Sequence, residues 1–318
     1  MPHQSKKTPD PFFVEALKQW RLSRHFVCTE NESDFNSLVS SSIFLVKQET
    51  KHHKWLLGLR HLDWDSRHFG IKMGKIFPFI TPEISSHQSE ALNIGHVLLE
   101  KFVNEAIVQE YKYLSVLIHP DDTVGQHLIS KAHFELMDTT VLYGLEITKQ
   151  SKFNCNKEIE LHIATEDDIA ELQSISETCF GDRTYNVNRF NSDIFLNQNK
   201  VKELYRLWIF NSFANRGMAD IVLIALYNGV LAGFITLKLN PNNMNAEIPL
   251  NAISPRFSGR GIYQTLVEFT LDYLETRGYR SVDIWTHLSN FAVQRTWQKL
   301  GAKPKSSAHQ FRRFFEDP

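Results

Sequence analysis

The sequence has few of the features that mark secreted, membrane-spanning or nucleic-acid-binding proteins. Its three cysteines, Cys28, Cys155 and Cys179, are an odd and widely spaced set that cannot form a disulfide framework. No apolar run approaches the roughly 20 residues that cross a bilayer, and the polar start Met1–Lys7 lacks a signal-peptide core. The formal net charge of −1 points to neither nucleic acid nor a membrane surface as a partner. These absences favour the reducing cytoplasm.

Histidine is plentiful, with 14 residues, but it forms no pattern of metal ligands. The pair His52-His53 and the single residues His61 and His68 lie in dissimilar contexts, so we predict no metal site. Hydrophobic residues make up 42% of the chain and aromatic residues 12%, which is ample for packed cores. At 318 residues, the length allows two domains.

One glycine-containing segment carries most of the functional information: Ile253-Ser-Pro-Arg256-Phe-Ser-Gly259-Arg260-Gly261-Ile262. It ends an apolar strand and opens a helix. Glycine has no Cβ, so the backbone at 259 and 261 can approach a ligand closely. The helix directs unpaired N–H groups and the positive end of its dipole at the same place, which suits a pyrophosphate. The predicted cofactor-binding residues of this loop are Ile253, Arg256, Phe257, Ser258, Gly259, Arg260, Gly261 and Ile262.

Two other phosphate-binding loops fit this segment less well. A Walker A loop needs Gly-Lys-Ser/Thr after its last glycine, where Ile262 and Tyr263 stand. A dinucleotide fingerprint needs a third glycine in step and an acidic residue about 20 residues on. Asp283 is near that distance, but Tyr263 and Gln264 break the glycine pattern. Taken alone, the loop also fits an ordinary turn before a helix.

The elements around the loop follow a fixed order of strands and helices. Two apolar strands joined by Asn228-Gly229 predict a hairpin, and apolar residues at helical spacing follow the loop. Asn290 is suited to cap the last helix. In chain order we predict strands at 221–227, 230–238 and 246–253, a helix from 262 to Gly278, a strand at 281–285, a helix at 291–300 and a strand toward Phe315.

This order, strand, Arg-x-x-Gly-x-Gly and helix, resembles the acetyl-CoA loop of the GNAT N-acetyltransferases. The resemblance implies an α/β (α+β) fold with mixed central sheets and acetyl-CoA as the cosubstrate. GNAT members carry an Asn that opens the last helix and a Tyr seven residues later, which often protonates the departing thiolate. Here these positions are Asn290, a further predicted cofactor contact, and Trp297. An indole N–H cannot lend a proton as a phenol can, so we predict no side-chain acid at 297.

The same resemblance marks Glu247 as a catalytic residue beside Trp297. Histone-type relatives place a general-base carboxylate six residues before the position of Ile253, and Glu247 stands there. The alternative is a solvated carboxylate on the strand. A backbone amide near 251–253 is expected to polarise the thioester carbonyl.

The first half of the chain repeats the order of the second half. A helix at 90–110, a strand at 113–119, a short helix through Ala132 and a strand at 134–147 are predicted, but the preceding segment 81–88 contains no glycine. We therefore predict two tandem GNAT-like halves, a degenerate one at 1–150 without cofactor and a catalytic one at 157–318. The polar connection 148–157 lies between them.

A second motif narrows the resemblance. The run Trp64-Asp65-Ser66 with Phe69-Gly70 is similar to a signature of the dTDP-fucosamine acetyltransferases. That likeness implies a 4-amino-6-deoxy sugar nucleotide as the small-molecule acceptor, with Arg183, Tyr185 and Arg189 in the loop that faces it. An arginine there suits a diphosphate.

Two other functions stay open at this point. The acceptor amine can belong to a polyamine, an aminoglycoside or a protein, and the chain can be a catalytically dead CoA-binding scaffold or sensor, which the loss of the usual Tyr at 297 favours. The sequence leaves the oligomeric state open, a homodimer included.

Overall fold

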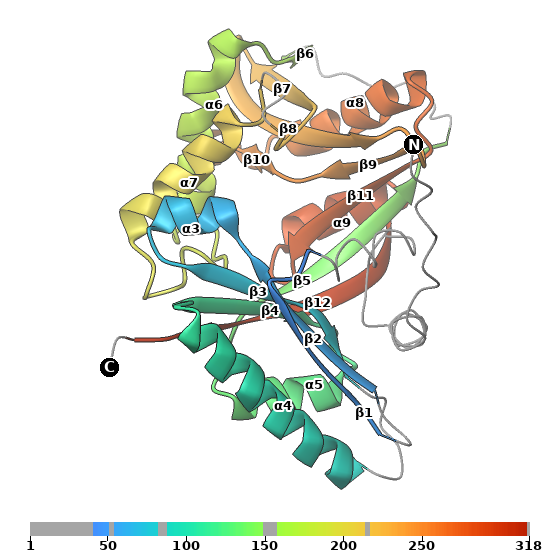
Figure 1. The fold of residues 1–318 in the computed structure, drawn as a ribbon. Helices are drawn as coiled ribbons and strands as arrows, with labels where there is room; N and C mark the ends of the chain where they lie inside the picture. The colour runs from blue at the N-terminus through green and yellow to red at the C-terminus, as the bar shows by residue number, and fades with distance from the viewer. Residues whose placement is uncertain (1–40, 51–53, 82–87, 149–157, 214–216, 317–318) are drawn as a thin grey trace, which may run out of the picture. The chain divides into compact units, whose positions relative to one another are not determined.

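A computed structural model describes residues 41–50, 54–81, 88–148, 158–213 and 217–316 (Figure 1). Several features discussed above lie outside these ranges: the start of the chain, Cys28, the pair His52-His53, most of the segment 81–88 and most of the connection 148–157, Cys155 included. Among the described residues, no helix is both long and apolar enough to cross a membrane. The chain forms two compact units, one made of residues up to Met137 together with those from Ala308 onward, the other of Asp138–Ser307.

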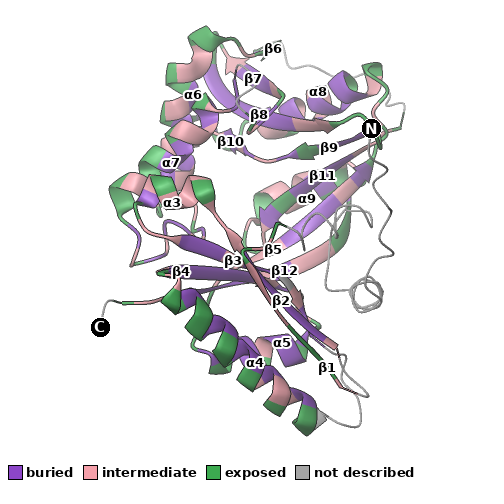
Figure 2. Ribbon diagram, viewed as in Figure 1, coloured by how far each residue is buried: buried purple, intermediate pink, exposed green. Residues whose placement is uncertain are grey.

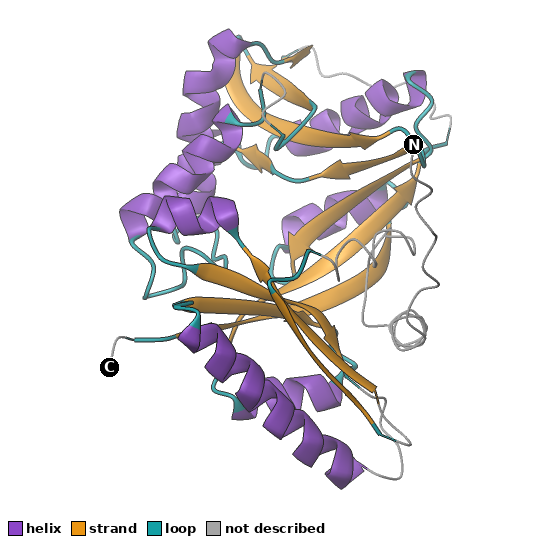
Figure 3. Cartoon of the chain, in the orientation of Figure 1, coloured by secondary structure: helices purple, strands orange, loops and turns teal. Residues whose placement is uncertain are grey.

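The first unit is a mixed sheet covered by helices (Figure 3). Its strands are β1 (Phe44–Glu49), β2 (Lys54–His61), β3 (Met73–Ile80), β4 (Tyr113–Ile118) and the end of β12 (Lys303–Phe314). They pair in that order, all antiparallel except β3 with β4. The helices are α3 (Asp63–Phe69), α4 (Gln88–Val108) and α5 (Thr123–Lys131). The core lies between sheet and helices and includes Trp55, Phe102 and Phe311.

The second unit is also a mixed sheet. Its strands, in order across the sheet, are β6 (Ile159–Ile163), β7 (Ile221–Tyr227), β8 (Val230–Asn240), β9 (Asn245–Ile248), β11 (Ser281–His287) and β5 (Glu135–Glu146); β10 (Asn251–Ile253) pairs separately with β8. Only β9 and β11 are parallel. The helices are α6 (Ile169–Ser176), α7 (Gln198–Phe210), α8 (Ile262–Thr276) and α9 (Phe291–Lys299). Figure 2 shows buried residues along the strands and exposed ones on the outer faces of the helices.

Each unit is completed by a strand from the other half of the sequence. β5 belongs to the first half of the chain but pairs antiparallel with β11, over His287↔Thr140 to Ser281↔Glu146. The last residues of the chain pair instead with β4, over His309↔Ile118 to Phe314↔Tyr113. Both strands were predicted, but their partners were not. Residues 149–157 of the predicted connection lie outside the described residues, so a domain boundary there stays a prediction.

The Trp64-Asp65-Ser66 segment forms the start of α3. The Ser66 hydroxyl accepts a hydrogen bond from the Met73 amide at 2.9 Å, which ties α3 to the first residue of β3. The Trp64 ring stacks on His68 at a centroid distance of 5.7 Å, and Phe69 is buried. These contacts give the motif a structural role within the first unit.

The strand exchange predicts a local response to Phe311→Ala. Phe311 is 6% exposed and pairs with Val116 of β4. Loss of its ring should destabilise the first unit by about 3–5 kcal/mol and speed hydrogen exchange at the β4 amides. Lys303→Ala, at an exposed position on the same strand, is the control. Faster exchange at β11 instead of β4 would contradict the observed pairing.

Candidate active site

The predicted pyrophosphate loop is a tight turn followed by two glycines in the left-handed region. A single 3₁₀ turn, Pro255–Phe257, follows β10, and the buried ring of Phe257 anchors it. Gly259 has φ = 77° and Gly261, the N-cap of α8, has φ = 76°. A Cβ at either position would meet no atom within 4 Å. Glycine is therefore required by the backbone dihedrals, and the space beside it is open.

The loop presents a row of unused backbone donors. Among the described residues, no acceptor lies within hydrogen-bond distance of the amides from Gly259 to Gln264. The first helical bond at this end runs from Thr265 N to Gly261 O, at 3.1 Å. Successive amides of this kind, at the positive end of the α8 dipole, form an anion-binding concavity.

The two arginines of the loop are both exposed. Arg260 donates from Nη1 to the Tyr227 hydroxyl at 3.3 Å, and its guanidinium lies 5.0 Å from the centre of that ring. Arg256 lies over Phe257 at 5.3 Å. The two side chains therefore flank the amide row with positive charge, and Arg260 is held in place by β7.

A gap opens between β10 and β11 directly before this loop. β9 and β11 pair in parallel as far as Ile248↔Ile284. Pro249 then interrupts the strand, after which the chain pairs with β8 while β11 stays paired with β5. The buried Thr236 hydroxyl accepts from Leu250 N and donates to Leu250 O, both at 2.9 Å. It satisfies the backbone where the regular ladder breaks.

The amides of Asn251 and Ile253 face this gap. Leu250 O accepts from Thr236 N, and Ser254 N donates to Ala232 O, both at 2.8 Å, so even-numbered residues face β8. In an antiparallel pair the intervening residues point their N–H groups to the other side. The Cys179 thiol lies 3.5 Å from Ile253 O as a donor. Burial raises the pKa of Cys179 to about 12, so it stays a neutral donor and not a nucleophile.

Comparisons with known proteins match the part of the chain that contains this gap and loop. Residues 185–302 match the Acetyltransferase (GNAT) family. A GCN5-related N-acetyltransferase from Sphaerobacter thermophilus superposes with a TM-score of 0.64 at 12% identity, covering 96% of this chain and 92% of that one. The second unit has the GNAT fold, and residues 185–302 within it carry the match to the acetyltransferase family. The expected acetyl-CoA loop thus lies within the matched region.

Likeness to other proteins extends across both GNAT-like halves. A tandem GNAT protein from the clavulanic acid biosynthesis pathway superposes with a TM-score of 0.56 at 10% identity, covering 96% of this chain and 95% of that one. The expected fold class, mixed sheets of GNAT type in two tandem halves, is confirmed. The spore coat polysaccharide biosynthesis protein SpsD of Bacillus subtilis is 23% identical over 128 residues, or 40% of this chain and 43% of SpsD. That match spans less than half of SpsD.

Glu247 lies on β9, in the part of the GNAT sheet that is still paired. Its register partners are Lys238 on β8 and Asp283 on β11. Ala246 and Ile248 on either side of it enter the core, so the exposed Glu247 points to the opposite face. Asp283, which alternation places on the same face, pairs with Lys305 at 2.8 Å. The structure thus places Glu247 before the gap opens.

Asn290 caps α9, with Oδ1 accepting from Val293 N at 3.4 Å, as the sequence predicts. Trp297, at the position of the usual GNAT tyrosine, is wholly buried, and its indole N–H donates to the Tyr263 hydroxyl at 3.0 Å. Burial raises the pKa of Tyr263, so this phenol is a weaker acid than usual. Trp297 therefore fills the core and positions a hydroxyl.

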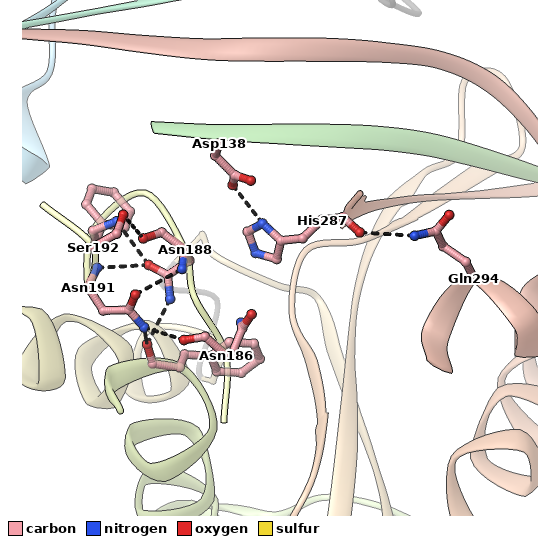
Figure 4. Close-up of polar contacts among 9 residues, drawn as sticks. Asp138, Asn186, Asn188, Asn191, Ser192, His287 and Gln294 are labelled. Carbon is pink, nitrogen blue, oxygen red and sulfur yellow. Dashed lines mark hydrogen bonds and ion pairs between the residues drawn. The ribbon is translucent and has the colours of Figure 1, made fainter. Parts of the chain in front are cut away.

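Buried asparagines hold the predicted acceptor loop in shape (Figure 4). The amide groups of Asn188 and Asn191 both donate to Phe180 O, at 2.8 and 2.9 Å, and Asn191 also donates to Asn186 O at 2.6 Å. The three predicted acceptor residues differ in their setting. Arg183 and Tyr185 are exposed, whereas Arg189 is half-buried with its guanidinium 4.5 Å from the Phe190 ring.

The pair of His287 and Asp138 was not predicted from the sequence. His287 Nδ1, at the end of β11, lies 2.7 Å from Asp138 Oδ2 on β5. No sequence signal joins residues so far apart, because the pair depends on the strand exchange. Among the described residues, no group of three or more His, Cys, Asp or Glu side chains could hold a metal ion.

The loop geometry predicts the effect of a carboxylate on acetyl-CoA affinity. Gly259→Asp and Gly261→Asp should each weaken binding about 10- to 100-fold, because the new charge lies beside the diphosphate. Isothermal titration calorimetry measures this directly. Gly278→Asp is the matched control, since Gly278 also has a positive φ (80°) but follows the other end of α8. Parent-like affinity in both loop variants would show that the amide row does not hold the cofactor.

Proposed function

We propose that the protein is an acetyl-CoA-dependent N-acetyltransferase that transfers the acetyl group directly to a primary amine of a small molecule, in a ternary complex. The observation that carries the proposal is the run of backbone amides from Gly259 to Gln264, which have no acceptor among the described residues and lie at the α8 N-terminus. These donors suit the diphosphate of CoA.

The gap between β10 and β11 suits the rest of the cosubstrate. The pantetheine arm would lie beside β10 and accept hydrogen bonds from the amides of Asn251 and Ile253, in the manner of an added strand. An amide in this stretch would also donate to the thioester carbonyl as it becomes an oxyanion. The amine nitrogen then bonds to the carbonyl carbon, the C–S bond breaks, and CoA leaves as a thiolate that takes up a proton.

We propose that the acceptor is an amino sugar nucleotide. Three features support this class: the Trp64-Asp65-Ser66 resemblance, the similarity to SpsD, a spore coat polysaccharide biosynthesis protein, and the arginines of the acceptor loop. Of the latter, Arg189 is the best placed, because the Phe190 ring holds its guanidinium and a guanidinium can grip a diphosphate bidentately. Arg183 and Tyr185 are exposed and would close on the ligand from the rim.

A panel of amines tests the proposed function. Acetyl-CoA affinity is measured first, and free CoA release is then followed with dTDP-4-amino sugars, spermidine, an aminoglycoside and a lysine peptide. We expect release chiefly with the sugar nucleotides. Transfer to the peptide or polyamine alone would overturn the sugar assignment and leave an acetyltransferase. Tight acetyl-CoA binding with no transfer to any amine would instead support the scaffold or sensor.

The buried setting of Trp297 predicts that its replacement leaves catalysis almost intact. Trp297→Phe should change kcat by less than tenfold, whereas loss of a general acid typically costs about 10²–10⁴-fold. Tyr263→Phe, which removes the hydroxyl bound by the indole, should behave alike. A loss of 10² or more in either variant, at unchanged acetyl-CoA affinity, would show that this hydrogen-bonded pair delivers the proton to the thiolate.

A further inference from the structure

The pair formed by His287 and Asp138 places an imidazole directly against a carboxylate. The two side chains approach to 2.7 Å between Nδ1 and Oδ2, and their exposed fractions are only 22% and 11%. In Figure 4 the imidazole projects from the end of β11 toward Asp138. The contact is an ion pair by distance, without the N–H···O alignment of a hydrogen bond. With Nδ1 against the carboxylate, Nε2 is the ring nitrogen left to take a proton from a substrate. Among the described residues, Nε2 makes no hydrogen bond or ion pair.

His287 lies beside the gap, on the face away from the core. Side chains alternate along β11, with Val282 and Ile284 in the core of the second unit. Residue 287 therefore falls on the opposite face and lies beyond Ile284, the last β11 residue that pairs with β9. This is the stretch of β11 that borders the gap assigned above to the thioester.

The backbone at His287 is held firmly. Its carbonyl accepts from Asn290 N at 2.9 Å and from Gln294 Nε2 at 3.2 Å. Gln294 also donates to Leu288 O at 2.8 Å, and the strand itself is hydrogen-bonded to β5. The backbone that carries the imidazole is thus held by β5 and by the turn before α9.

The charged and titratable groups around the pair come from three elements. Asp138 belongs to β5, Tyr205 to α7 and Arg189 to the acceptor loop. Burial chiefly raises the pKa of Tyr205, and Arg189 and Asp138 act on it electrostatically in opposite directions. Asp138 and Arg189 therefore each lie close enough to Tyr205 of α7 to act on it.

We propose that His287, oriented by Asp138, is the general base that deprotonates the acceptor amine, an inference that rests on the proposed function. Nε2 takes one proton from the ammonium form, and the carboxylate stabilises the resulting imidazolium. The free amine then attacks the thioester carbon. As the C–S bond breaks, the remaining excess proton on nitrogen passes to the CoA thiolate, and His287 returns its own proton to solvent.

Glu247 is the competing candidate, and the structure separates the two. Glu247 pairs in register with Asp283, four residues before His287 on β11. At about 3.3 Å per residue, their attachment points lie roughly 13 Å apart along the strand. One amine cannot contact both groups at once, so variants at the two positions can be told apart.

Steady-state kinetics from pH 6 to 9.5 tests the assignment. We expect His287→Gln to lower kcat/KM for the amine by about 10²–10⁴-fold at pH 7, with unchanged acetyl-CoA affinity. The loss should shrink by about tenfold per pH unit while the fraction of free amine rises. Asp138→Asn should weaken transfer in the same direction. His162→Gln is the matched control, because His162 lies 3.7 Å from Glu160 on the edge strand β6.

Chemical rescue separates a base from a structural residue. Added imidazole should restore part of the activity of His287→Ala but not of Gly259→Asp. A pH profile of His287→Gln parallel to that of the parent, or absence of rescue in folded His287→Ala, would overturn His287 as the base. Either result would leave the proposed acetyltransferase function standing. The same holds if Glu247→Gln, and not His287→Gln, shows the pH-dependent loss. A parent protein that binds acetyl-CoA but transfers to no amine would overturn the proposed function and the base together.

Discussion

The hydrogen bonds between β5 and β11 are the constraint on which the second unit depends. β11 leaves β9 after Ile284, so within the described part of the chain its last three residues have no strand partner on that edge. Backbone groups left unpaired on both edges would be costly. Because β5 pairs with β11 as far as His287, the other edge can stay open. An extended cosubstrate arm requires an open strand edge next to the glycine loop. By pairing with one edge of β11, β5 allows the other edge of β11 to stay open for that arm.

Irregular backbone near the gap is stabilised by a few buried polar side chains. Thr236 bonds both backbone groups of Leu250, where Pro249 ends the ladder. Cys179 donates to Ile253 O. In the acceptor loop, the side-chain amides of Asn188 and Asn191 both donate to Phe180 O. Each of these side chains adds a hydrogen bond to the backbone at or near the end of a regular element. The shape of the gap is therefore fixed before any ligand arrives.

Trp297 changes how the last step of the proposed reaction can occur. A phenol at this position would give its proton to the leaving thiolate, but the indole N–H is already bonded to Tyr263. The thiolate of CoA can leave without assistance, because a thiol is acidic enough to be stable as its thiolate near neutral pH. The step that needs acid–base catalysis is then deprotonation of the acceptor amine. A base beside a carboxylate, such as His287 beside Asp138, can carry out that step.

Local patterns in the sequence determined the strands, the helices and the loop. Gly259 and Gly261 need positive φ, Asn290 caps its helix, and the hairpin at Asn228-Gly229 formed as predicted, because these features depend on neighbours within a few residues. The pairing of β5 with β11 and of the chain end with β4 did not follow from any pattern. Strand partners are chosen by packing across the whole chain, and apolar alternation looks alike in either arrangement. For the same reason, only the tertiary structure could bring Asp138 to His287.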